Sequence, residues 1–138
     1  MFDYCLYFNT TALARLLDRE WTKAFQPFGL TPSQAFMLRV ILEKPGLLQR
    51  ELADMLTISR PTATRTLDGL AEKGLIVRET TERDGRELAL KPTAKAKGLE
   101  DKIKAASAKV SQRLKQEMGA EHFDITVTKI KGIRSILK

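Results

Sequence analysis

Apolar residues recur at steps of three and four along most of the 138-residue chain, which is the period of amphipathic helices. Helices are predicted over residues 4–28, 31–44, 49–56, 59–73, 93–118 and 120–137. Between residues 75 and 91 the pattern changes to two short apolar runs, 75–80 and 87–91, which flank Asp84 and Gly85 and predict a β-hairpin. The chain is therefore predicted to be mainly α, with one small β element.

The middle of the chain combines two short helices, a tight turn and this hairpin. Ser59 is placed to cap the second short helix, and Pro61 fits its first turn, where an N–H has no helical partner. Gly74 suits the left-handed position at the end of that helix. A buried stripe is predicted from the spacing of Ala63, Leu67, Leu70 and Ala71. This order of elements is typical of a winged helix-turn-helix.

The predicted outer face of the second short helix carries arginines and hydroxyls, and no carboxylate occurs on it before Asp68. Such a face suits contact with phosphates and base edges. An ordinary solvated surface helix is the alternative, and Arg65 by itself does not exclude it. DNA binding is favoured by the whole set of features: a basic helix with an N-cap, a glycine at its C-terminal end, and a hairpin whose turn is basic.

Several short motifs in this region resemble the MarR family of bacterial and archaeal regulators. They are Glu51-Leu52-Ala53, Ser59-Arg60-Pro61-Thr62-x-Thr64-Arg65, Leu70-x-x-Lys73-Gly74-Leu75-Ile76-x-Arg78 and Asp84-x-Arg86. The resemblance implies a homodimeric winged-helix regulator, usually a repressor, released from DNA by a small phenolic or anionic ligand or by an oxidant. It also implies that the helix from Ser59 to Lys73 enters the major groove. Arg86 would then reach the minor groove, with Asp84 orienting the arginines of the wing.

On this basis the expected partner is double-stranded DNA with a pseudo-palindromic operator. DNA contacts are expected from Gln49, Ser59, Arg60, Pro61, Thr62, Thr64, Arg65, Thr66, Arg83, Asp84 and Arg86. The alternative function is a winged-helix protein–protein interaction module without DNA binding, because fold does not determine function. That alternative predicts an apolar or acidic outer face on the second short helix.

The terminal regions, residues 1–30 and 93–138, are predicted to form long dimerisation helices around a DNA-binding lobe of residues 31–92. They carry more apolar surface than one small domain can cover, which favours a homodimer. A twofold axis would place the two recognition helices roughly 34 Å apart, about one turn of DNA. The chain is expected to be a single domain of this kind.

Composition and charge narrow the possible functions further. The net charge is +7, and residues 59–97 hold nine basic against six acidic residues, so a polyanionic partner is favoured. No apolar run is long enough for a membrane span, and Asp3 stands where a secretion signal is basic, so a cytoplasmic location is expected. One cysteine excludes an internal disulfide, and with the lone His122 it forms no plausible zinc site. No catalytic motif or cofactor-binding motif was found, so neither an enzyme nor a cofactor is expected.

Two further groups could bear on regulation. Cys5 has two interpretations: a small buried apolar residue or incidental thiol, or a redox sensor of the kind found in one branch of the family. Asn9 and Arg19 stand where that branch has tyrosines, which weakens the second interpretation. Trp21, Phe25, Phe36 and Met37 could line a ligand cleft between the DNA-binding lobe and the long helices, or they could simply form core.

Overall fold

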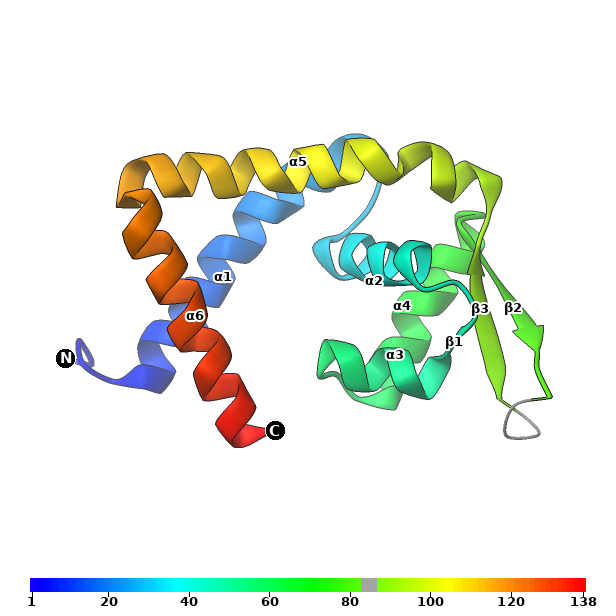
Figure 1. Cartoon of the computed structure of the whole chain (residues 1–138), viewed down its shortest axis with the longest axis horizontal. Coiled ribbons are helices and arrows are strands. Elements are labelled where there is room, and N and C mark those ends of the chain that lie inside the picture. Colours follow the sequence, from blue (N-terminus) through cyan, green and yellow to red (C-terminus); the bar gives the residue numbers. More distant parts are fainter. Residues whose placement is uncertain (83–86) are drawn as a thin grey trace.

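The computed structural model describes residues 1–82 and 87–138 of the chain. The elements are α1 (Leu6–Phe25), η1 (Gln26–Phe28), α2 (Pro32–Glu43), β1 (Leu47–Leu48), α3 (Gln49–Leu56), α4 (Arg60–Glu72), β2 (Ile76–Thr80), β3 (Leu88–Pro92), α5 (Ala94–Met118) and α6 (Ala120–Leu137). The long helix α5 spans the molecule, with α1 and α6 at one end and the lobe of α2 to α4 and the sheet at the other (Figure 1). The predicted winged helix-turn-helix with long terminal helices is confirmed.

Side-chain caps start three of the helices at the predicted residues. Thr31 and Gln34 form a reciprocal capping box at the start of α2. Ser59 caps α4 by accepting a hydrogen bond from the N–H of Thr62 at 3.3 Å, and Thr93 caps α5 in the same way from Ala96. Because each cap bonds a donor only three residues away, these helix starts follow from the local sequence.

The first helix is shorter than its apolar pattern predicts. α1 ends at Phe25, and the chain continues as the 3₁₀ turn η1 before Gly29, which adopts the left-handed conformation with φ of 67°. Pro27 lies in this turn and explains the early end, because proline has no N–H for the helix ladder and its ring crowds the carbonyl four residues earlier. The prediction of one continuous helix over residues 4–28 was therefore wrong at its C-terminal end.

The sheet has three antiparallel strands in the order β1-β3-β2. β2 and β3 form the predicted hairpin, with Ile76 opposite Pro92 and Thr80 opposite Leu88. β1 was not predicted as a strand; its two residues, Leu47 and Leu48, pair with Leu90 and Ala89. Two residues are too few to show an alternating pattern, so only the pairing with β3 reveals this strand. The predicted turn at Asp84 and Gly85 lies outside the described residues.

The hydrophobic core lies inside the lobe and under α5. Its fully buried large side chains come from α1, α2, β1, α3, α4, β3, α5 and the residue before β2: Phe25, Met37, Leu38, Ile41, Leu48, Leu52, Leu67, Leu70, Leu75, Leu90 and Ile103. The predicted stripe on α4 is confirmed for Ala63, Leu67 and Leu70, which have no exposed surface, while Ala71 is only partly buried against the same core. Burying such side chains is the main force that fixes α4 against α2 and α3.

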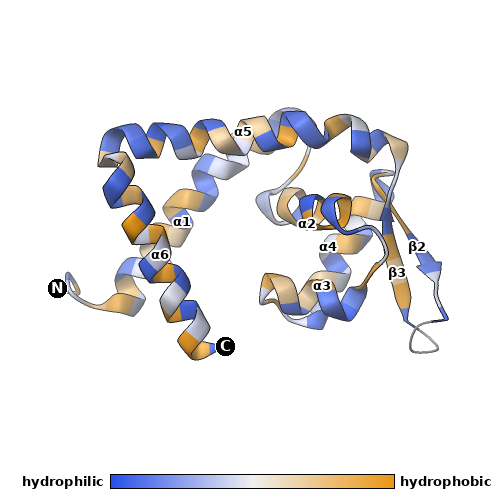
Figure 2. Ribbon diagram, viewed as in Figure 1, coloured by the Kyte–Doolittle hydropathy of each residue, from blue (hydrophilic) through white to orange (hydrophobic). Residues whose placement is uncertain are grey.

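The helices at the other end leave much apolar surface uncovered. Large side chains on α1 and α6 are exposed, including Leu6, Tyr7, Leu13, Leu16, Ile125, Val127, Ile130, Ile136 and Leu137. Every residue of α6 is at least partly exposed, and Figure 2 shows apolar positions along both helices. Within the described parts of the chain, no helix has the length and apolarity to cross a membrane.

Candidate nucleic-acid interface

The helix α4 presents a polar face opposite its buried stripe. Arg60, Pro61, Thr64 and Arg65 are exposed, and Thr62 and Thr66 are partly buried on the flank. The exposed residues share a face because one helical turn holds about 3.6 residues, and the apolar side points into the lobe. Six of the expected contact residues thus belong to α4. Four of them form its exposed face, and the other two lie at the edge of that face.

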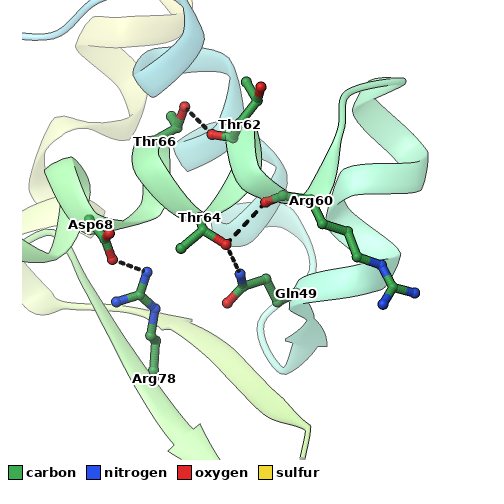
Figure 3. Close-up of polar contacts among 7 residues, drawn as sticks. All are labelled: Gln49, Arg60, Thr62, Thr64, Thr66, Asp68 and Arg78. Atoms are coloured by element: carbon green, nitrogen blue, oxygen red, sulfur yellow. Dashed lines mark hydrogen bonds and ion pairs between the residues drawn. The ribbon is translucent and has the colours of Figure 1, made fainter.

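Hydrogen bonds hold most of the hydroxyls on this face (Figure 3). The hydroxyl of Thr64 donates to the carbonyl of Arg60 at 3.0 Å and accepts from Gln49 Nε2 at 2.8 Å. The hydroxyl of Thr66 donates to the carbonyl of Thr62 at 3.0 Å. Ser59 contacts the Thr62 hydroxyl at 2.9 Å. Gln49, the first residue of α3, is therefore held beside the polar face of α4, next to other residues that are expected to contact DNA.

The charges on this face are unevenly neutralised. Asp68 is its first carboxylate, and it pairs with Arg78 of β2 at 2.7 Å. Arg60 and Arg65 form no ion pair with any described residue. The face thus keeps two positive charges that no residue in the described part of the chain neutralises, while its acid is compensated, which favours a polyanionic partner.

A polar hollow of about 320 Å³ lies between the start of α3, α4 and β3. It is lined by Gln49, Arg50, Arg60, Thr64, Glu87 and Leu88, and an ion pair of 3.6 Å joins Arg50 to Glu87. The expected wing residues Arg83, Asp84 and Arg86 lie outside the described residues. The structure thus brings Gln49, Arg60 and Thr64 of the expected contact set to one hollow, beside Glu87 and Leu88 at the start of the returning wing strand.

The end of α4 is fixed by contacts that sequence reasoning did not find. Lys73 donates hydrogen bonds to the carbonyl of Gly29 and, at 2.8 Å, to the side-chain oxygen of Gln34. Lys95 donates to the carbonyl of Lys73 at 2.9 Å. These bonds join α4 to the α1–α2 connection and to α5. Lys73 stood in a recognised motif, but its partners lie 22 to 44 residues away along the chain, so no local pattern marked them.

The four residues expected to line a ligand cleft occupy different environments. Phe25 and Met37 are buried core residues, with 0% and 1% of their surface exposed. Trp21 is partly buried and donates its indole N–H to the Ser107 hydroxyl at 3.0 Å. Phe36 is exposed and, with Met37, borders a separate hollow of about 260 Å³ beside α4. The structure does not bring these four residues to one cleft.

A larger hollow of about 630 Å³ lies between α1, η1 and α5. Its walls combine apolar side chains such as Phe28 and Val110 with the cations Lys23, Lys109 and Arg113. Arg113 of α5 donates a hydrogen bond to Glu20 on the facing wall, α1, and this bond, with the positive charge, lowers the pKa of the Glu20 carboxyl below its ordinary value of 4.5. Sequence reasoning missed this site, because the two walls are about 90 residues apart.

Cys5 is exposed and lies directly before α1. Its sulfur accepts a weak hydrogen bond from the N–H of Phe8 at 3.5 Å, so it caps the helix. The thiol is therefore not a small buried apolar residue, and the remaining interpretations, an incidental thiol and a redox sensor, both fit an exposed cysteine.

Comparisons with known proteins agree with this geometry. Residues 28–87 match the sequence profile of the MarR family. The HTH-type transcriptional regulator YybA of Bacillus subtilis, itself uncharacterized, is 35% identical over 85 residues, which is 62% of this chain. A relative from Thauera aromatica is 42% identical over 65 residues, or 47% of this chain. These matches cover 57% and 39% of the two relatives, so the chain spans about half of their length.

Solved structures extend the similarity over nearly the whole chain. The transcriptional repressor CouR, bound to a 23-mer DNA duplex, is 27% identical with a TM-score of 0.86, covering 94% of this chain and 92% of that one. CouR bound to p-coumaroyl-CoA is 25% identical with a TM-score of 0.85, covering 94% and 91%. The family profile over residues 28–87, the motifs around α4 and the shared fold together make this chain similar to the regulators of the MarR family.

Proposed function

We propose that this chain is a homodimeric, sequence-specific DNA-binding transcriptional regulator that acts in the cytoplasm, where bacterial and archaeal DNA lies. The outer face of α4 carries the proposal, because Arg60 and Arg65 have no ion-pair partner there among the described residues while Asp68 is neutralised. The DNA-bound state of CouR supports the same use of the fold. A protein–protein module is disfavoured, since it would require an apolar or acidic face at this position.

The homodimer is supported by the uncovered apolar surface of α1 and α6. Leu6 and Leu16 on α1 and Ile136 and Leu137 on α6 are all more than half exposed. So many exposed large apolar side chains on two helices are unusual for a soluble monomer, and a second copy would cover them across a twofold axis. The two α4 helices of the dimer would then each bind one half of a pseudo-palindromic operator.

DNA binding is tested by titrating the protein against a labelled duplex from upstream of its own gene. Each phosphate contact contributes about 0.9 to the slope of log affinity against log salt. Arg65→Ala should weaken binding, whereas Lys102→Ala removes the same charge from the outer part of α5 and should not. Equal effects of the two substitutions would show that net charge, and not the face of α4, governs binding. Light scattering of the free protein measures the dimer directly.

We infer that the regulator is a repressor and that a small phenolic or anionic effector releases it from DNA. The hollow between α1 and α5 supports this, because apolar Phe28 and Val110 lie beside Lys23 and Lys109. Such walls suit an aromatic body with a negative group. CouR is a repressor seen with p-coumaroyl-CoA, an effector-like molecule of that chemistry.

An effector can act only if it binds the DNA-incompetent state more tightly than the competent one. p-Coumaroyl-CoA and p-coumaric acid are suitable probes. A raised Tm together with weakened DNA binding, both lost in Lys109→Ala, would support the site. An oxidant acting on the exposed Cys5 is the alternative trigger, and Cys5→Ser would then abolish release by peroxide.

A further inference from the structure

We propose that Gln49 and Thr64 together select one A·T base pair in each half of the operator. In this proposal the amide of Gln49 binds adenine, and the methyl group of Thr64 packs against a thymine methyl. The inference rests on the proposed DNA-binding function and adds to it the identity of a base pair and the residues that recognise it.

The amide of Gln49 is held in one orientation. Its Nε2 donates to the hydroxyl of Thr64 at 2.8 Å, and Gln49 makes no other side-chain hydrogen bond to any described residue. Figure 3 shows the amide oxygen turned away from Thr64. A glutamine amide has two N–H donors and one carbonyl oxygen. In this proposal Thr64 accepts the N–H on the Cγ side of the amide, which leaves the oxygen and the second N–H together on the other edge.

That remaining edge matches adenine and not guanine. In the major groove adenine offers an N6 donor and an N7 acceptor, which pair with the carbonyl oxygen and the N–H of a glutamine. Guanine offers two acceptors, N7 and O6, so the carbonyl oxygen of Gln49 would face another oxygen. The hydrogen bond to Thr64 also restricts the long side chain before DNA arrives, which reduces the entropy lost on binding.

The hydroxyl of Thr64 has its proton and one of its two lone pairs engaged by the protein. It donates its single proton to the carbonyl of Arg60 at 3.0 Å and accepts from Gln49. It therefore has no proton left to offer to a base, and the methyl group of this exposed side chain is available for an apolar contact with DNA. Threonine methyl groups make apolar contacts with the C5-methyl of thymine. The two residues line the same polar hollow between α3, α4 and β3.

The proposal is tested by selecting bound duplexes from a random pool of 23-base-pair DNA with the wild-type protein and with Gln49→Ala. The wild type should enrich an A·T pair at one position in each half-site. Gln49→Ala should lose that preference, on the order of 10-fold in relative affinity for adenine over guanine, and keep the preferences at other positions. Gln116→Ala, a glutamine exposed on α5, is the matched control and should select the wild-type sequence.

A second measurement isolates the methyl contact. In the selected duplex, deoxyuridine replaces each thymidine in turn, which removes only the C5-methyl. One replacement should weaken wild-type binding and have no effect on Thr64→Ser, which keeps the hydroxyl and lacks the methyl. Thr64→Val keeps a methyl but not the hydroxyl, so it should remain sensitive to deoxyuridine and lose part of the preference for adenine.

The outcomes separate this inference from the function on which it rests. If the wild type enriches no sequence and binds no DNA, the proposed function is wrong. If it enriches a site and Gln49→Ala enriches the same site with the same adenine frequency, DNA binding stands and the assignment to Gln49 is overturned. Loss of adenine in the control Gln116→Ala would overturn it equally.

Discussion

The ion pair between Asp68 and Arg78 offers a sharp test of how this protein would contact DNA. Arg78 lies on β2, and its guanidinium contacts the Asp68 carboxylate at 2.7 Å, on the same side of α4 as Thr64. We expect Arg78 to act by masking Asp68 and not by binding phosphate itself. Arg78→Ala leaves Asp68 unpaired on a surface that would face DNA, so it should weaken binding.

The size of the effect follows from Coulomb's law. A carboxylate about 8 Å from a phosphate in water costs about 0.5 kcal/mol. Two flanking phosphates would therefore cost about 1 kcal/mol, which raises Kd roughly fivefold at low salt and less as salt screens the charges. The stability of the free protein should fall by only about 0.5 kcal/mol, because the side chain of Asp68 is 54% exposed.

The assay is a double-mutant cycle by fluorescence anisotropy at low salt, with the selected duplex as ligand. Arg78→Ala should bind more weakly than the wild type, and Asp68→Asn should bind as tightly or more tightly. Adding Asp68→Asn to Arg78→Ala should restore near wild-type affinity, since no carboxylate is left to mask. A double variant as weak as Arg78→Ala alone would refute the reasoning and show that Arg78 contacts the DNA directly.

Three further predictions concern stability. Glu20→Gln should lower Tm at neutral pH, because the folded state lowers the pKa of Glu20 and is therefore stabilised by the charged carboxylate. In a series of melting curves at decreasing pH, the difference in Tm from the wild type should be complete above the ordinary pKa of 4.5. It should vanish as the pH falls through the lowered pKa. Leu67→Ala removes a fully buried side chain and should cost about 2–5 kcal/mol in urea unfolding. At Gly69 a Cβ would lie 2.6 Å from Gln34 Nε2, so Gly69→Ala should not stabilise the wild type. In a Gln34→Ala background the same substitution should raise the free energy of unfolding by about 1 kcal/mol, because alanine favours a helix more than glycine does. Equal effects in both backgrounds would contradict the contact.

The sequence by itself determined the order and type of the main elements and the starts of three helices. The caps at Thr31, Ser59 and Thr93 bond donors three residues away, and the buried stripe of α4 repeats with the helical period. These features depend on neighbours along the chain, so local chemistry is sufficient to predict them. The same pattern overestimated α1, because apolar spacing continued past Pro27, where the backbone cannot continue as an α-helix.

The tertiary structure alone decided which side chains meet. The sequence marked Gln49 and Thr64 as separate candidates, but only the angle between α3 and α4 brings the amide to the hydroxyl. In the same way Arg78 reaches Asp68, and Lys73 reaches Gly29, because of how the sheet and α2 pack on α4. An amphipathic pattern tells whether a side chain points inward, not which element it meets there. For that reason Trp21 and Phe25 could be placed near the core from their spacing, while the hollow between α1 and α5 could not be found before the helices were packed.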